Sequence, residues 1–145
     1  QKELEELSNE FSNLVVDKVV MSKEINGSLN FIKQKSKQYK FWIITGTPTN
    51  EMKNIVNQLE ITKYFKGIHG SPKNKKYWVD FLLKNFKLNP EETLFLGDAT
   101  TDYEAALWGN LKFALRESNY NKLLFENIDI PRFKNFNELN LLLNE

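Results

Sequence analysis

The sequence carries two aspartates, Asp98 and Asp102, just after the short apolar run Thr93-Leu94-Phe95-Leu96. Carboxylate oxygens suit Mg²⁺, which takes one or two carboxylates and completes its coordination shell with water and substrate phosphate. A plainer interpretation is a turn aspartate followed by an aspartate that caps a helix. The metal interpretation is favoured if the apolar run is a buried strand, because ligands bind beyond the carboxyl ends of such strands.

A hydroxyl side chain and a glycine follow a second apolar run. Thr45 and Gly46 come directly after Phe41-Trp42-Ile43-Ile44. A threonine hydroxyl and free backbone N–H groups can hold a phosphate oxygen, helped by the positive end of a following helix. Thr47 and Pro48 predict that helix, with Thr47 as its cap and Pro48 at its first position. A threonine before a helix is also common as a simple cap, so this pair alone leaves both interpretations open.

Three lysines form the third candidate feature. Lys73, Lys75 and Lys76 surround the expected start of another helix. A lysine there could neutralise a phosphoryl group, although solvated surface charge is the ordinary interpretation. Lysines near a helix N-terminus oppose the helix dipole, which is unusual for charge without a role.

Apolar patterning predicts the elements that would position these residues. Short runs rich in β-branched or aromatic residues predict buried strands over residues 41–44, 65–68, 93–96 and 111–115. Helical spacing predicts helices over residues 1–20 and 28–39, through Met52–Leu59 and Val79–Phe86, from Thr101 or Asp102 to Leu107, and in two closing stretches, the last through Phe136–Leu143. Strands that alternate with helices indicate an α/β fold with a Rossmann-like parallel sheet and helices on both faces. All three candidate features then lie at or near the carboxyl side of a strand.

Composition narrows the class of protein. The 20 basic and 19 acidic residues nearly cancel, which gives no reason to expect nucleic acid or an anionic membrane as a partner. The sequence has no cysteine and one histidine, so thiolate and multi-histidine metal sites are excluded from it. No apolar run approaches the roughly 20 residues that cross a bilayer, and Gln1–Leu4 lacks the apolar segment of a signal peptide. We therefore expect a cytoplasmic protein.

The three features together, in this order, resemble motifs two, three and four of the haloacid dehalogenase superfamily, closest to its phosphoglycolate-phosphatase-like members. Phe41–Pro48 resembles the motif-two strand, Gly70–Lys75 the segment with the motif-three lysine, and Leu94–Ala106 the motif-four acidic loop and helix. Phe113–Arg116 resembles the next strand. The resemblance runs from about residue 11 to the C-terminus.

The resemblance implies an enzyme that hydrolyses small phosphorylated metabolites with Mg²⁺. Thr45, with Gly46, would bind the transferred phosphoryl group. Lys75 would neutralise the nucleophile and the phosphate, with Lys73 and Lys76 as fallbacks because the family's spacing varies here. Asp98 would ligate Mg²⁺, and Asp102 would support the metal through water or Lys75.

The sequence departs from the family at its nucleophile. The family's first strand ends in Asp-x-Asp, and no Asp-x-Asp occurs in this sequence. Asp17 follows an apolar run, but Val19 stands where the second aspartate would be, so the helical interpretation of that run is preferred. We expect residues 1–26 to be the end of a helical cap with its return segment, and 27–145 a core that lacks its first strand. An upstream segment carrying that strand is the expected partner.

Two other classes of function stay open. A degenerate relative could bind phosphate ligands or proteins without turnover, although such a domain need not keep Thr45, a suitable lysine, Asp98 and Asp102. Single-domain response-regulator-like proteins share the α/β architecture, but they need an acidic cluster at the first strand, which is absent here.

Overall fold

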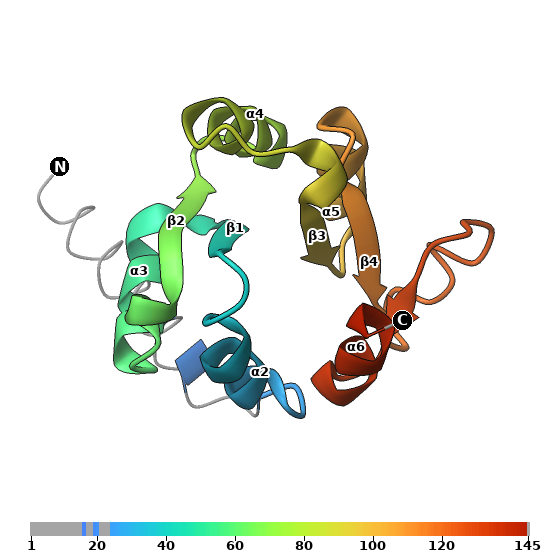
Figure 1. Ribbon diagram of the computed structural model, residues 1–145, viewed down its shortest axis with the longest axis horizontal. Coiled ribbons are helices and arrows are strands. Elements are labelled where there is room, and N and C mark those ends of the chain that lie inside the picture. The colour runs from blue at the N-terminus through green and yellow to red at the C-terminus, as the bar shows by residue number, and fades with distance from the viewer. Residues whose placement is uncertain (1–15, 17–18, 21–23, 145) are drawn as a thin grey trace, which may run out of the picture. The chain divides into compact units, whose positions relative to one another are not determined.

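The computed structural model describes residues 16, 19–20 and 24–144 (Figure 1). They fall into two compact units: residues 16, 19–20, 24 and 32–72 belong to the first, and residues 25–31 and 73–144 to the second. Most of the helix expected over residues 1–20, with Asp17, lies outside the described residues. The predicted domain boundary at residue 26 stays a prediction.

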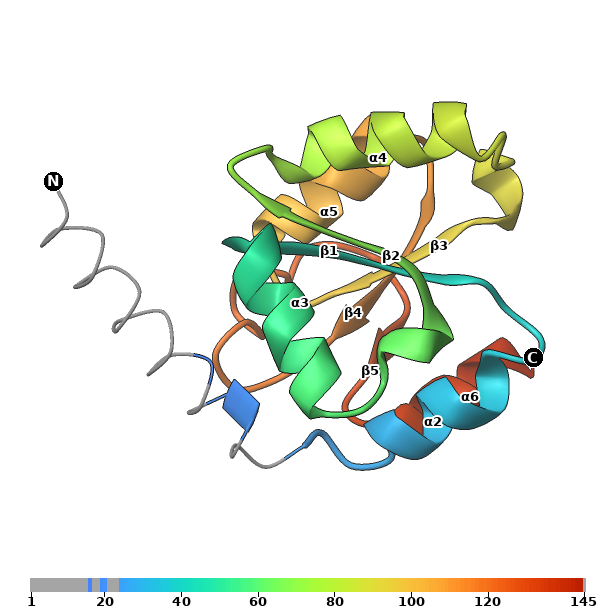
Figure 2. The same ribbon diagram turned by 90° about the vertical axis from the view of Figure 1, so that its left-hand side faces the viewer.

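The first unit is built on two parallel strands, β1 (Phe41–Pro48) and β2 (Phe65–Ser71). The helix α3 (Thr49–Gln58) connects them and packs on the strand pair through its apolar side, on which Ile55 and Val56 are buried (Figure 2). A 3-10 turn, Thr62–Tyr64, leads into β2. Burying the apolar face of α3 against the strands is what stabilises this βαβ unit.

The second unit contains a three-stranded parallel sheet with the order β3-β4-β5. Its strands are β3 (Leu94–Gly97), β4 (Lys112–Arg116) and β5 (Arg132–Phe133). Its helices are α4 (Lys75–Asn85), α5 (Thr100–Trp108) and α6 (Phe136–Leu143), with α2 (Ser28–Lys35) beginning in this unit and a 3-10 turn at Pro90–Glu92. The Phe31 and Phe136 rings, 5.2 Å apart between centroids, join α2 to α6.

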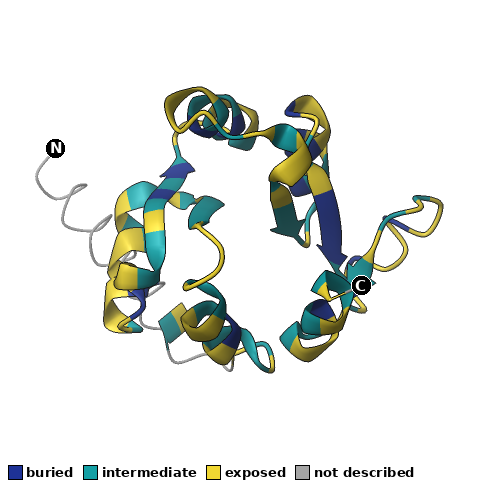
Figure 3. Ribbon diagram, viewed as in Figure 1, coloured by how far each residue is buried: buried dark blue, intermediate teal, exposed yellow. Residues whose placement is uncertain are grey.

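The core of the second unit gathers around β4. Phe113, Ala114 and Leu115 are consecutive and all buried, and β4 is correspondingly dark in Figure 3. A strand buried on both faces is typical of a parallel sheet with helical cover. Phe113 and Leu115 share one buried cluster with Ala106 of α5 and with Phe125 of the loop that follows β4. The α/β fold with a parallel sheet, expected from the alternation of strands and helices, is confirmed.

Two details of the sequence prediction are wrong. First, β1 continues through Pro48 instead of ending at Ile44, and Thr47 does not cap α3. Pro48 occupies the N-cap position with φ −54° and ψ 139°, and no side chain caps the helix. The proline ring fixes φ in a range that also suits an extended strand, so the strand ends one residue before the helix rather than four.

Second, residues 117–131 form turns and a loop, whereas one of the two closing helical stretches was expected there. Side chains bind the backbone groups that a helix would use for itself. The Asn121 amide accepts from the Ser118 N–H, and the Arg132 guanidinium donates to the carbonyls of Phe125 and Ile128. The short strand β5 that follows was not predicted.

The two described sheets are separate ladders. β1 pairs with β2, β3 pairs with β4, and within the described ranges neither β1 nor β3 has a second strand partner. Within the part of the chain that the structure describes, no helix combines the length and apolarity that crossing a membrane requires.

Candidate functional site

Asp102 organises the loop between β3 and α5. Its side chain is buried, and Oδ2 accepts hydrogen bonds from the N–H groups of Asp98, at 3.1 Å, and Ala99, at 3.0 Å. The carboxylate also lies in the first turn of α5, where the helix dipole favours negative charge. Gly97 makes room for this arrangement, because a Cβ there would lie 2.4 Å from the Asp102 Cβ.

Lys75 completes a polar cluster with Asp102. Its Nζ lies 2.8 Å from Asp102 Oδ1 and donates to Thr101 Oγ1 at 2.9 Å. Lys75 is the first residue of α4, and the Asn74 side chain caps that helix by accepting from the Tyr77 N–H. The ion pair offsets the unfavourable position of a lysine at a helix N-terminus. The two side chains are 18% and 8% exposed, so solvent screens the pair only partly.

Lys73 and Lys76 have different surroundings. The Lys73 Nζ lies 4.9 Å from the centroid of the Tyr77 ring, and the Lys76 Nζ lies 5.5 Å from that of Trp108. Both are cation–π contacts on exposed side chains. Of the three lysines that the sequence left in competition, Lys75 is the one that reaches the acidic loop.

Asp98 presents an exposed carboxylate that makes no hydrogen bond or ion pair with any described residue. Its peptide groups are held instead: the N–H donates to Asp102, and the carbonyl accepts from Asn121 Nδ2 at 2.9 Å. A fixed backbone with an unengaged hard oxygen donor fits Mg²⁺. The described residues hold no group of three or more His, Cys, Asp or Glu side chains that could bind a metal, so water, phosphate or other ligands would complete the shell.

Thr45 and Gly46 lie in an irregular part of β1, in the first unit. Ile44 pairs with His69 and Pro48 with Ser71, so β1 has two more residues than β2 between these pairs. The Thr45 Oγ1 accepts from the Thr47 N–H at 3.2 Å, which leaves the hydroxyl proton available to an anionic oxygen. Apart from Gly46 and its two chain neighbours, no heavy atom lies within 4 Å of the position that a Cβ on Gly46 would take. This open bulge is compatible with the predicted phosphate-binding role.

The structure thus brings Lys75, Asp98 and Asp102 together in the second unit, while Thr45 and Gly46 belong to the first. Sequence reasoning missed Asn121, which contacts the main chain of Asp98. Asn121 stands in a polar stretch typical of an exposed turn, and no local signal marks it as buried.

Three solved structures show how widely this fold is shared. YfnB of Bacillus subtilis, described as a HAD-hydrolase bound to magnesium, is 18% identical with a TM-score of 0.68, over 83% of this chain and 55% of that one. The haloacid dehalogenase-like protein SP0104 of Streptococcus pneumoniae is 22% identical with a TM-score of 0.70, over 86% and 62%. The core domain of a candidate phosphoglycolate phosphatase from Streptococcus pneumoniae is 17% identical with a TM-score of 0.65, over 87% and 88%.

At these identities the likeness establishes the fold. The chain spans 55% and 62% of the length of the first two of these proteins. No curated protein matches it. The family model described as haloacid dehalogenase-like hydrolase matches residues 1–115, which include β1, Lys75 and the Asp98–Asp102 loop. With that match over most of its length and the same fold as the solved hydrolases, the chain belongs to the haloacid dehalogenase-like hydrolase family.

Proposed function

We propose that this chain is the C-terminal part of a Mg²⁺-dependent phosphomonoester hydrolase. The observation that carries the proposal is the unengaged Asp98 carboxylate beside the Lys75–Asp102 ion pair at the carboxyl end of β3. Phosphoryl transfer needs its charge neutralised and its reactants held in line. An exposed acid, a fixed lysine and a rigid loop are the parts that such chemistry uses.

Each site residue has a distinct task in this proposal. Asp98 binds Mg²⁺, which when bound offsets negative charge on the phosphoryl oxygens. Lys75 neutralises the phosphoryl group, and the Thr45 hydroxyl with the Gly46 backbone binds one of its oxygens. Asp102 acts as a positioning residue, because Oδ1 holds Lys75 and Oδ2 holds two N–H groups of the loop.

The nucleophile would come from a further segment. The sequence holds no Asp-x-Asp, and β1 and β3 each have one strand partner among the described residues. Unpaired backbone groups at a buried sheet edge need partners. We propose that an upstream strand ending in Asp-x-Asp pairs at these edges and supplies the nucleophile and the acid/base. The substrate class is a small phosphorylated metabolite. The near-neutral charge supports neither nucleic acid nor an anionic membrane as partner, and the cytoplasmic location remains a prediction.

The alternative is a non-catalytic domain that binds phosphate ligands or proteins. The lack of Asp-x-Asp in this sequence favours it, and the coding sequence upstream of Gln1 separates the two proposals. An apolar strand ending in Asp-x-Asp there would support the enzyme. A start codon next to Gln1 would support the binding domain.

The metal role is tested by Asp98→Asn in the protein extended by that upstream segment. We expect the substitution to reduce Mg²⁺-dependent hydrolysis of p-nitrophenyl phosphate by about 10²- to 10³-fold, as loss of one preorganised electrostatic group does. Asp129→Asn is the matched control, because Asp129 is exposed and far along the chain in the 117–131 loop. Unchanged turnover and an unchanged Mg²⁺ midpoint in Asp98→Asn would rule out the metal role.

A further inference from the structure

Asn121 is a buried amide, 5% exposed, in a loop whose neighbouring side chains face solvent. Buried polar side chains are costly unless they are hydrogen-bonded, so the bonds that this one makes indicate its role. We propose that Asn121 is a positioning residue that fixes the main chain of Asp98 for Mg²⁺ binding. The proposal rests on the proposed function and adds a residue to it.

Both the nitrogen and the oxygen of the Asn121 amide form hydrogen bonds. Nδ2 donates to the Asp98 carbonyl at 2.9 Å and to the Arg116 carbonyl at 2.8 Å, while Oδ1 accepts from the Ser118 N–H at 2.8 Å. Asp98 follows the end of β3, and Arg116 is the last residue of β4. One side chain therefore ties the loop after β3 to the end of the neighbouring strand. A neutral amide does this without adding a charge beside a cation site.

Asp98 is thereby held through both of its peptide groups. Asp102 accepts from its N–H, and Asn121 donates to its carbonyl. The carboxylate itself has no hydrogen-bond partner among the described residues. Its position therefore depends on the bonds of the Asp98 peptide groups. Removing the Asn121 side chain would leave the Asp98 carbonyl without this hydrogen bond, so the position of the Asp98 carboxylate would be less well fixed.

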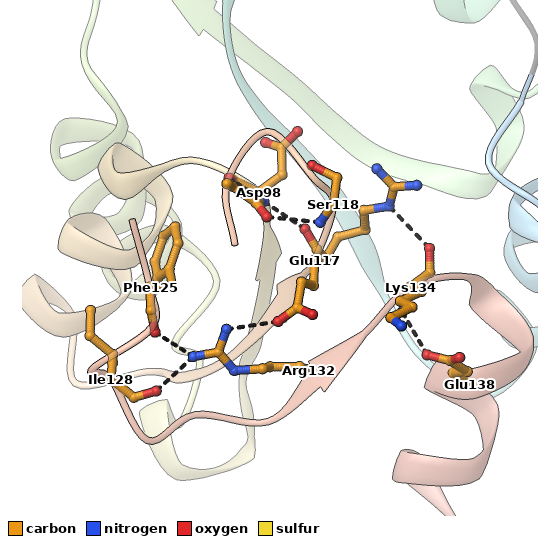
Figure 4. Close-up of polar contacts among 10 residues, drawn as sticks. Asp98, Glu117, Ser118, Phe125, Ile128, Arg132, Lys134 and Glu138 are labelled. Atoms are coloured by element: carbon orange, nitrogen blue, oxygen red, sulfur yellow. Dashed lines mark hydrogen bonds and ion pairs between the residues drawn. The ribbon is translucent and has the colours of Figure 1, made fainter. Parts of the chain in front are cut away.

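The loop that carries Asn121 has an independent anchor. The Arg132 side chain donates to the carbonyls of Phe125 and Ile128 and pairs with Glu117 Oε2 at 2.8 Å (Figure 4). The Phe125 ring is fully buried in the core cluster. The side-chain partners of Arg132 are Glu117, Phe125 and Ile128, so replacing Arg132 removes contacts of the loop and none of the bonds between Asn121 and Asp98.

The test measures Mg²⁺ binding by titration calorimetry in the same extended protein, with Mg²⁺ alone as the probe. Asn121→Ala should weaken the Mg²⁺ affinity by about 10- to 100-fold, the usual effect of removing a group that orients a metal ligand. Arg132→Met is the control: it should lower the unfolding temperature and leave the Mg²⁺ affinity within about twofold of the wild type. If Asn121→Ala does not fold, Asn121→Gln, which moves the amide outward by one methylene, should weaken binding in the same direction.

Equal Mg²⁺ affinities in wild type and the Asn121 variants would overturn the inference, as would an equal loss in Arg132→Met, because the loop would then act only through general stability. The Asp98→Asn variant separates this failure from failure of the proposed function. If Asp98→Asn binds Mg²⁺ as the wild type does, the metal site itself is misplaced and both proposals fall. If Asp98→Asn loses binding while Asn121→Ala keeps it, only the positioning role is wrong.

Discussion

At the scale of single residues, the three lysines at the start of α4 differ in what their ammonium groups contact. Lys75 contacts Asp102 and Thr101, whereas Lys73 and Lys76 lie over aromatic rings. We expect Lys75→Met to reduce turnover of p-nitrophenyl phosphate by about 10²- to 10³-fold, because one preorganised positive charge is lost where phosphoryl charge develops.

Lys73→Met and Lys76→Met are the matched controls for Lys75→Met. Each should leave kcat/KM within about twofold, because the ammonium groups of Lys73 and Lys76 lie over aromatic rings. The loss of such an exposed cation–π contact should lower the free energy of unfolding by only about 0.5–1 kcal/mol. Urea unfolding should show that Lys75→Met lowers the free energy of unfolding by about 1–3 kcal/mol, because the buried Asp102 carboxylate loses its charged partner. The bonds of Asp102 to the N–H groups of the loop would remain. A turnover defect confined to Lys73 or Lys76 would reassign the catalytic lysine.

The sequence could predict that Asp98 and Asp102 lie in one loop at the end of a strand, because both belong to one motif, and their catalytic roles stay a prediction. It could not choose among the lysines, since the choice depends on which side chain the first turn of α4 turns toward Asp102. The burial of Asn121 could not be predicted, for a different reason. Its burial results from its own bonds to the main chain of Asp98, Arg116 and Ser118, of which Asp98 is 23 residues away in the sequence.

At the scale of elements, Gly97 controls the junction between β3 and α5. A Cβ at this position would lie 2.4 Å from the Asp102 Cβ and 2.7 Å from its Oδ2. We expect Gly97→Ala to push Asp102 from its bonds to the loop and to Lys75, with a loss of about 1–3 kcal/mol in the free energy of unfolding. Urea denaturation measures this loss.

Gly46→Ala is the matched control for stability at Gly97. Nothing lies within 4 Å of the position of its added Cβ, so the same chemical change should alter the free energy of unfolding by less than about 1 kcal/mol. Equal losses in both variants would mean that glycine flexibility, rather than the approach of Asp102, matters at Gly97.

The strand β2 carries His69, whose pKa is lowered by burial and, to a smaller extent, by the positive charge of Lys53 on α3. The unfolded chain takes up this proton near the ordinary value of about 6.5, while the folded chain resists it. Between the two pKa values the unfolded state binds more protons, so stability falls as the pH drops below about 6.5. Thermal unfolding at pH 7.5 and 5.5 should show this decrease, and His69→Asn should reduce it. An identical decrease in His69→Asn would assign it to other groups.

The same scale explains which elements the sequence could predict. Apolar runs locate strands well when both faces are buried, as with Phe113, Ala114 and Leu115 of β4. β5 has only two residues, which is too short for an apolar pattern to predict a strand. In the stretch where a closing helix was expected, Leu123 and Leu124 are 78% and 65% exposed in the loop. Side-chain bonds from Asn121 and Arg132, which no local pattern encodes, decide the conformation there.

At the scale of the whole molecule, the described strands form a pair and a triplet. The resemblance places the family's first strand between the strands of motifs two and four, and we propose that an upstream segment supplies it. In the proposed function, the metal ligand Asp98 follows β3, Lys75 follows β2, and the bulge proposed to bind phosphate lies within β1. The proposed function thus assigns the groups that bind phosphate and metal to this chain, and the nucleophile that attacks the phosphate ester to an upstream segment.

The last prediction concerns that division. The chain of 145 residues alone should not hydrolyse p-nitrophenyl phosphate at any Mg²⁺ concentration, because no carboxylate in it occupies the nucleophile's place in an Asp-x-Asp strand. Extension by an upstream segment that contains such a strand should restore turnover, and replacing its first aspartate by asparagine should abolish turnover while Mg²⁺ binding persists. Turnover by the 145 residues alone would show that a nucleophile lies within them. An extended protein that binds Mg²⁺ and phosphate but does not hydrolyse p-nitrophenyl phosphate would favour the non-catalytic binding domain. Such a protein would have the residues that bind the ligand and would lack hydrolytic activity.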